Sequence, residues 1–466
     1  MAQIAGNKGA ANNRYQVLAW NLLFVLCEVA LYPGGLDIQI YLTIGFYGFI
    51  LYQTSVNLTR GIGYFVTFTL LSLNQSNYLF HSVLPPSFFG LRVLGVSAHS
   101  LFTIVLTLLV VYKTGLSNIG NSLRGDFPTF TIWFIIYGFV FGGILVMSGE
   151  NYLDNYEKDL KTYLPVLFYF IIVKPLSRDD YYHIIKNCII AVCFLYLVSF
   201  SFGKSRQYVE GIDSSLTCTF ASTIILLIFS LRSFFSLKIA ILIFLVQLGL
   251  HSTGFVTLGG KSFIYLITFL IWYGYHKKNT MAVVPISILL LVVPTLLHVL
   301  GSYFSDNVIG GKAAQVQLLF SDIRLSALGD HRSSIGNIAG ESLTLIDNCL
   351  NDLSYLFFGR GFGGGLSDSL GYLNYWAGNH GYNTIDVVRN SYHKMHVAFL
   401  EVFIKFGLVG WIFYLRLVLR AFRNSGFSAV LYGIFFLLMF CVSKEYILLV
   451  VVFWGSLENP IKQRLA

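Results

Sequence analysis

Apolar runs long enough to cross a lipid bilayer recur along almost the whole chain, from residue 15 to residue 457. Only 11% of the 466 residues are charged, whereas a soluble globular protein carries roughly 25%. Hydrophobic residues make up 56% of the chain, and the mean hydropathy is +0.69. The sequence therefore predicts an all-α, polytopic integral membrane helix bundle.

The apolar runs predict about fourteen spans, some of them shorter than about 20 residues because tilted or short helices need less length. The runs cover residues 15–32, 36–54, 61–80, 92–112, 129–147, 160–173, 184–202, 216–231, 237–250, 262–275, 281–300, 397–415, 427–442 and 446–457. Residues 1–300 would thus hold helices 1 to 11, residues 301–394 one large loop, and residues 395–466 helices 12 to 14.

The net charge of +9 is explained by topology, because Lys and Arg are retained on the cytoplasmic side of a membrane. If the N-terminus lies inside, the inner loops hold Arg60, Lys113, Arg124 and the run His276-Lys277-Lys278. The outer loop 204–213 is a partial exception, since it holds two basic residues. We predict a multi-pass protein of the bacterial inner membrane, with both termini cytoplasmic, loop 301–394 periplasmic and no nucleic-acid partner.

The loop 301–394 is too long for a passive connection between two helices. Residues 313–328 and 335–358 carry apolar side chains at helical spacing. The glycine-rich run 359–365 then breaks the second helix. We therefore expect a helical periplasmic cap that lies over the outer face of the bundle.

Two histidines and a carboxylate stand where this loop returns to the membrane. His393 and His396 are three residues apart, so on a helix they would share one face, with Glu401 about 80° round. An imidazole titrates near ambient pH and can act as a base. Interfacial histidines without function, or a metal site, are the other interpretations. No third ligand and no Cys/His pair has metal-binding spacing, so we predict neither a metal nor another cofactor.

Basic residues near the same boundary are candidates for binding an anionic substrate. The loop holds Arg324, Arg332, Arg360 and Arg389, and arginine binds phosphate bidentately without losing its charge. Surface ion pairing is the alternative interpretation for each arginine. Arg360 lies among glycines, whose backbone N–H groups can form an anion-binding nest. Lys261 stands at an outer helix start, where simple snorkelling to the interface is the alternative.

The order of these features resembles the O-antigen polymerase and O-antigen ligase superfamily of bacterial envelope glycosyltransferases. The resemblance covers roughly residues 237–420 and rests on Lys261, Arg332-Ser333-Ser334-Ile335, Gly359-Arg360-Gly361-Phe362-Gly363, His396-Val397-Ala398-Phe399-Leu400-Glu401 and Gly407-Leu408-Val409-Gly410. The chain departs from the family pattern at Lys261, where arginine is usual, and at Val397, where asparagine is common.

The resemblance implies a GT-C-like enzyme of lipopolysaccharide biosynthesis that uses an undecaprenyl-pyrophosphate-linked glycan as donor and needs no metal or cofactor. His396 would act as the base or orient the acceptor hydroxyl, His393 would support it, and Glu401 would orient a histidine. Pyrophosphate and glycan would be bound by Arg332, Arg360, Arg324, Arg389, Lys261 and Tyr392.

Three functions remain open at this stage. We favour an O-antigen polymerase, which joins lipid-linked repeat units by metal-independent, inverting glycosyl transfer at the periplasmic face. A ligase that transfers the glycan to lipid A core is the alternative within the same family. A transporter that flips lipid-linked oligosaccharides is the alternative from another class, although the sequence shows no two-fold internal repeat. The expected partners are lipid-linked oligosaccharides, membrane lipids and a chain-length regulator.

Overall fold

A computed structural model of the chain describes residues 36–72, 92–93, 96–177, 206–209, 212–215, 334–373 and 397–423, together with parts of 16–23, 179–187, 382–395 and 447–455. These residues are mostly helical, as the all-α prediction requires. Two short antiparallel strand pairs accompany the helices. Strand β1 (Arg92–Val93) pairs with β2 (Val96–Ser97), and β3 (Arg206–Val209) pairs with β4 (Ile212–Ser215).

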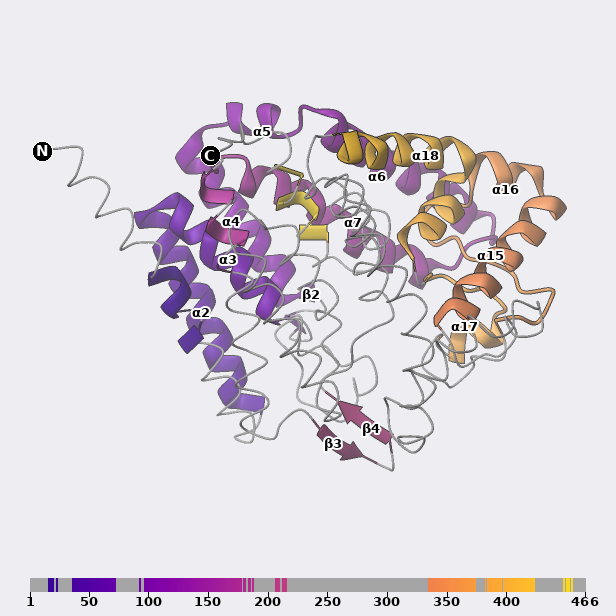
Figure 1. Cartoon of the computed structure of the whole chain (residues 1–466), viewed down its shortest axis with the longest axis horizontal. Coiled ribbons are helices and arrows are strands. Elements are labelled where there is room, and N and C mark those ends of the chain that lie inside the picture. Colours follow the sequence, from indigo (N-terminus) through magenta and orange to yellow (C-terminus); the bar gives the residue numbers. More distant parts are fainter. Residues whose placement is uncertain are drawn as a thin grey trace, which may run out of the picture.

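The described helices fall into an N-terminal and a C-terminal group. They are α2 (Leu36–Val56), α3 (Leu58–Ser72), α4 (Ala98–Thr114), α5 (Ser117–Ser122), α6 (Asp126–Met147), α7 (Leu153–Val173), α15 (Ser334–Asn351), α16 (Leu353–Phe358), α17 (Thr384–Val388) and α18 (Ala398–Arg423). Helices α2, α3 and α4 lie at one end of the molecule, and α15, α16 and α17 lie at the other (Figure 1). Helices α6 and α18 pack side by side, and α7 contacts both α4 and α6.

Two of the described helices are long and apolar enough to cross a membrane, Asp126–Met147 and Ala398–Arg420. Their apolar windows are only 33% and 44% buried. On α6 the large side chains of Trp133, Phe139 and Met147 are exposed, which suits contact with lipid rather than with water. Helices α2, α3, α4, α6, α7 and α18 overlap predicted spans, whereas the spans predicted between residues 188 and 300 and over 427–442 lie outside the described residues.

The amphipathic stretch 335–358 forms helices, as predicted, but as two helices with a break at Asp352. The Asp352 side chain caps α16 by accepting hydrogen bonds from the N–H groups of Ser354 and Tyr355, at 2.8 and 3.3 Å. Helix α16 ends at Gly359, where the glycine-rich run begins. The other predicted cap helix, 313–328, lies outside the described residues.

Helix α18 is kinked at Gly407, which adopts φ +58°. A Cβ atom there would lie 2.4 Å from the backbone of Phe357, so glycine is required both by the conformation and by the close approach of α16. The kink frees the carbonyls of Ile404 and Lys405 from the helix. They accept hydrogen bonds from the N–H groups of Arg360 and Gly361, both at 2.8 Å. The glycine-rich run therefore docks on the broken helix.

The same run also docks on α6 through Phe362. Its N–H group donates to the carbonyl of Gly138 at 3.0 Å, and a Cβ atom on Gly142 would lie 2.4 Å from the Phe362 nitrogen. Gly138 and Gly142 are four residues apart, and this small-residue spacing lets a backbone approach a membrane helix closely. The Phe362 ring stacks on Tyr163 of α7, with the centroids 5.2 Å apart. One loop thus ties α6, α7 and α18 together.

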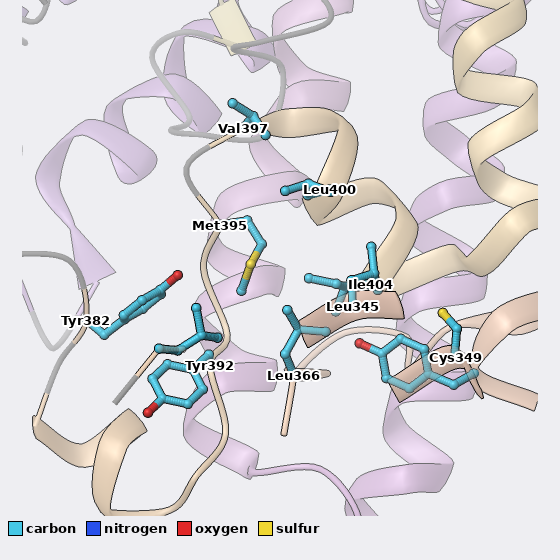
Figure 2. Close-up of a cluster of buried hydrophobic side chains, with 11 residues drawn as sticks. Leu345, Cys349, Leu366, Tyr382, Tyr392, Met395, Val397, Leu400 and Ile404 are labelled. Carbon is cyan, nitrogen blue, oxygen red and sulfur yellow. The ribbon is translucent and has the colours of Figure 1, made fainter. Parts of the chain in front are cut away.

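An apolar cluster anchors the segment that leads into α18 (Figure 2). Its buried members include Leu345 of α15, Ile404 of α18, and Tyr392 and Met395 of the segment itself. Tyr392 and Leu366 exchange two backbone hydrogen bonds of 2.9 Å each. This packing sets the position of residues 393 and 394, which carry the polar groups described next.

Candidate functional site

His393 does not lie on a helix, so the helical face predicted for the two histidines does not include it. Residues 391–395 are extended or turn-like, and α18 begins only at Ala398. The backbone bridge between Tyr392 and Leu366 competes with helix formation. Glu401 in the first turn of α18 accepts a hydrogen bond from the Met395 N–H at 3.1 Å, so a side chain of the helix holds the segment that precedes it. His396 lies outside the described residues.

His393 is buried, with a side chain that is only 2% exposed. Its Nε2 atom lies 3.2 Å from Oδ1 of Asp159, although the ring is not aligned for a straight hydrogen bond. Within the described part of the chain, neither the ring nitrogens nor Oδ1 of Asp159 make an aligned hydrogen bond, but Nε2 and Oδ1 face each other whereas Nδ1 has no such neighbour. The carboxylate beside this histidine is therefore Asp159 on α7, and not Glu401 as the sequence analysis expects.

Asp159 is fully buried and is held by two other segments. Its Oδ2 atom accepts hydrogen bonds from the Gly363 N–H at 2.8 Å and from Lys405 Nζ at 2.6 Å. The glycine-rich run binds this anion through the single N–H group of Gly363, whereas the N–H groups of residues 360–362 donate to carbonyls, so the run does not form a nest around it. The anion in this structure is a carboxylate of the same chain.

Glu401 completes a cluster of paired charges. Its Oε1 atom lies 3.1 Å from Nζ of Lys394 and 3.6 Å from Nζ of Lys405. Two carboxylates and two ammonium groups balance one another, which is how proteins tolerate buried charge. Lys394 is the most accessible member, with a side chain that is 40% exposed, so the cluster reaches solvent on that side.

The cluster shifts the pKa of both members of the Asp159–His393 pair. Burial by itself raises the pKa of the Asp159 carboxyl, but the charge that His393 carries when it is protonated and the charges of Lys405 and Lys394 lower it well below its usual range. Burial lowers the pKa of His393 below 6.5 by more than Asp159 raises it. The imidazole is therefore neutral at pH 7, and the two lysines are the cations that keep Asp159 ionised.

Two of the predicted anion-binding arginines are paired with carboxylates, and each has a partner at or just after the turn between α6 and α7. Arg360 lies 2.5 Å from Glu150 and 3.0 Å from Asp352, measured between guanidinium nitrogen and carboxylate oxygen. Arg389 lies 2.7 Å from Asp154. Residues 150–159 follow the fifth predicted span, so with the N-terminus inside they lie on the outer side, as the cap does, and these contacts bring the two together. Both arginines therefore form ion pairs, which was the alternative interpretation of these residues in the sequence.

Of the other predicted binding residues, the structure describes only Tyr392. Tyr392 is fully buried, and its ring packs edge-on against Tyr382 with the centroids 4.8 Å apart. Lys261, Arg324 and Arg332 lie outside the described residues, so their positions relative to His393 are not described. Among the residues that the structure does describe, no group of three His, Cys, Asp or Glu side chains has an arrangement that could hold a metal ion.

Sequence reasoning missed Asp159 and Lys405. Lys405 carried a usable signal, because an ionisable residue within a predicted span marks a functional site by default and needs a partner. It also stands four residues after Glu401, which gives an i,i+4 ion pair on one helix face. Asp159 precedes a predicted span by one residue and reads as an ordinary interfacial carboxylate, so only its packing distinguishes it.

No family model, curated protein or solved structure matches this chain. The chemistry of the site therefore has to be argued from its own residues. A neutral imidazole whose Nδ1 has no hydrogen-bond partner among the described residues, beside a carboxylate held ionised by two lysines, is suited to accepting a proton from a hydroxyl group.

Proposed function

We propose that this chain is an integral-membrane glycosyltransferase that polymerises undecaprenyl-pyrophosphate-linked repeat units of a surface polysaccharide, as an O-antigen polymerase does. The observation that carries the proposal is the buried His393 imidazole, whose Nε2 lies 3.2 Å from Asp159 Oδ1 and whose Nδ1 has no hydrogen-bond partner in the described part of the chain. We also propose fourteen spans, a site on the outer, periplasmic side of the membrane and cytoplasmic termini.

In the proposed reaction, the hydroxyl of an acceptor glycan attacks the anomeric carbon C1 of the donor sugar. The new C1–O bond forms as the bond between C1 and the phosphate oxygen breaks, and the anomeric configuration inverts. Undecaprenyl pyrophosphate leaves with the electron pair, and the hydroxyl proton passes to an imidazole. His393 takes this proton itself or passes it to His396, three residues along the chain.

The leaving pyrophosphate needs cations where its charge develops. Lys394 is close to His393 and partly exposed, so it can approach the leaving group. Arg360 and Arg389 have carboxylate partners at the α6–α7 turn, so they would reach a pyrophosphate by exchanging those partners. Arg324, Arg332 and Lys261 remain candidates for the same role on the family resemblance alone.

The test is complementation of a strain that lacks this chain, with the length of the lipopolysaccharide glycan as the readout. His396→Ala and Arg360→Ala are each expected to leave a membrane-inserted protein and lipopolysaccharide with a single repeat unit. His276→Ala is the control, since this histidine is predicted on the opposite side of the membrane. Long-chain glycan from both site variants would overturn the assignment of the site.

A second variant separates substrate binding from ion pairing at Arg360. Glu150→Gln removes one carboxylate partner but keeps the arginine, so it should retain polymer if Arg360 acts on the substrate. Loss of polymer in both Arg360→Ala and Glu150→Gln would indicate that the ion pair itself is what matters.

The same strain distinguishes the alternatives. Loss of a polymerase leaves core with one repeat unit, whereas loss of a ligase leaves bare core and accumulated lipid-linked polymer. Elongation of lipid-linked repeat units by the purified protein alone would exclude a pure transporter.

A further inference from the structure

Asp159 is presented to His393 in a single orientation. The Gly363 N–H and the Lys405 ammonium group both bind its Oδ2 atom, at 2.8 and 2.6 Å. The carboxylate therefore cannot turn freely, and its Oδ1 atom is directed at the imidazole, 3.2 Å from Nε2. The bond to Lys405 joins residues 246 apart in the sequence, so this arrangement depends on the packing of α7 against α18.

We infer that Asp159 is the positioning residue of His393: its Oδ1 atom keeps the ring proton on Nε2, so that the Nδ1 lone pair is the base that takes the proton from the acceptor hydroxyl. This inference rests on the proposed function, in which an imidazole accepts that proton. It assigns the reacting nitrogen, which the family resemblance and the sequence leave open.

The assignment follows from the hydrogen-bonding capacities of the two groups. A neutral imidazole has one donor nitrogen and one acceptor nitrogen, whereas an ionised carboxylate only accepts. The nitrogen that faces Asp159 must therefore carry the proton, and the other nitrogen must be the acceptor. Nδ1 is that acceptor, and no partner for it is present among the described residues. Nε2 and Oδ1 also lack an aligned hydrogen bond, but they lie 3.2 Å apart and can satisfy each other, which leaves Nδ1. Because buried polar atoms are almost always hydrogen-bonded, a group that arrives with the substrate would be the partner of Nδ1.

The other charged groups around the ring do not compete with Asp159 for this role. Glu401 and Lys405 on α18, and Lys394 beside His393, complete the set of titratable neighbours. Glu401 is already bound by the Met395 N–H and by Lys394, and no contact joins it to the ring in the described structure. The lysines keep Asp159 ionised, and an ionised Asp159 stabilises the imidazolium formed when Nδ1 accepts the proton.

The imperfect alignment between Nε2 and Oδ1 is compatible with this role. Hydrogen bonds at catalytic sites are often poorly aligned before the substrate binds and tighten in the complex with substrate. Burial also lowers the pKa of His393 below 6.5, which keeps the imidazole in its neutral form at pH 7. The ring is thus ready to accept a proton before the reaction begins.

The test compares Asp159→Asn with the wild-type protein in lipid nanodiscs. The substrate is the lipid-linked repeat unit isolated from cells that lack this chain. An asparagine amide has the size of the aspartate side chain, but it can donate to Nε2 and so favours the opposite tautomer. We expect kcat to fall by about 10²–10⁴-fold, the usual contribution of a general base, with KM little changed and a changed pH profile.

Glu157→Gln is the matched control, because Glu157 lies on the same helix and pairs only with the exposed Lys161 among the described residues. It should keep the wild-type kcat. If Asp159→Asn does not fold, the double variant Asp159→Asn/Lys405→Met is used in the same assay in its place. The second substitution removes the cation that the first leaves unpaired.

A second readout does not depend on activity. In protein labelled with ¹⁵N-histidine, the signal that His393→Gln removes should report a proton on Nε2 in the wild type and on Nδ1 in Asp159→Asn. A wild-type signal with the proton on Nδ1, or full kcat with an unchanged pH profile in Asp159→Asn, would overturn the positioning role. A wild-type protein that does not elongate the repeat unit would overturn the proposed function, while the tautomer signal would still decide the role of Asp159.

Discussion

The two ends of the molecule bury polar groups in different ways. In α2–α4 several buried threonine hydroxyls donate to a carbonyl of their own helix, as when Thr54 donates to the Ile50 carbonyl and Thr107 to the Thr103 carbonyl, at 2.8 and 2.7 Å. Between α7 and α18 the buried groups are ions whose partners come from distant segments, as in the Asp159–Lys405 pair. Among the described residues of α2–α4, no Asp, Glu, Lys or Arg side chain is buried.

This difference separates scaffold from site. A threonine that donates to the carbonyl four residues earlier needs nothing from the rest of the fold, and it carries no charge that could react. A buried ion pair costs desolvation free energy and is stable only when its geometry is completed by tertiary contacts. Buried ions in a membrane protein therefore mark the place where a charged group has a task. The following variants test this contrast, from the largest expected effect to the smallest.

Removing the buried cation should have the largest effect on stability. Lys405→Met leaves the carboxylates of Asp159 and Glu401 buried without their shared partner, and breaking such a pair costs about 3–5 kcal/mol. The measurement is the Tm of the purified protein in detergent. The control is Arg420→Met, whose pair with Asp126 is about half exposed and worth at most about 1 kcal/mol. Equal Tm shifts in the two variants would remove the distinction between buried and exposed pairs.

Adding a side chain where Gly142 of α6 meets Phe362 should have the next largest effect on stability. In Gly142→Ala the new Cβ atom would meet the Phe362 backbone at 2.4 Å, and overpacking of this kind costs about 1–3 kcal/mol. The same change at Gly45 of α2 meets no atom within 4 Å. Gly45→Ala should therefore be neutral or stabilise by up to about 1 kcal/mol, because alanine favours the helix. A Tm that falls equally in both variants would show that the close contact with Phe362 does not require glycine at position 142.

The response to pH should be smaller and should depend on His393. Because burial lowers the pKa of this group in the folded state, the unfolded chain binds the proton more readily than the folded protein does. The stability that comes from the neutral imidazole is therefore complete above pH 6.5 and is lost as the pH falls below it. We expect the Tm to fall between about pH 7.5 and 5.5 in the wild type, and to fall less in His393→Gln. Identical pH profiles would exclude His393 as the source.

Breaking the pair between the cap and the α6–α7 turn should have the smallest effect on stability. The Arg389 and Asp154 side chains are 31% and 42% exposed, and pairs of this kind contribute about 0.2–1 kcal/mol. Arg389→Ala should therefore leave the Tm almost unchanged. If glycan length falls nevertheless, the arginine acts on the substrate and not on the fold. A large loss of Tm would instead make Arg389 part of the scaffold.

Local patterns were sufficient for the helices near the site. The apolar spacing over 335–358 and the glycines after it predicted the helical segment and its end, because both signals act within one or two turns of chain. The position of His393 outside a helix was not predictable in this way. The competing backbone bridge from Tyr392 to Leu366 is a contact between segments, and it overrides the local spacing.

By itself, the sequence determined that this chain is rich in membrane-length apolar helices and that a histidine and a carboxylate stand at the start of one of them, since run length and residue type are local properties. Only the tertiary structure decided that Asp159 and not Glu401 faces His393, and that the N–H groups of the glycine-rich run bind α6, α18 and Asp159. The physical reason is that the contacts with Asp159 and α6 join residues more than 200 positions apart, and even those with α18 join residues 44 apart, beyond the reach of a local pattern. Their geometry depends on the kink at Gly407 and on the close packing of the helices.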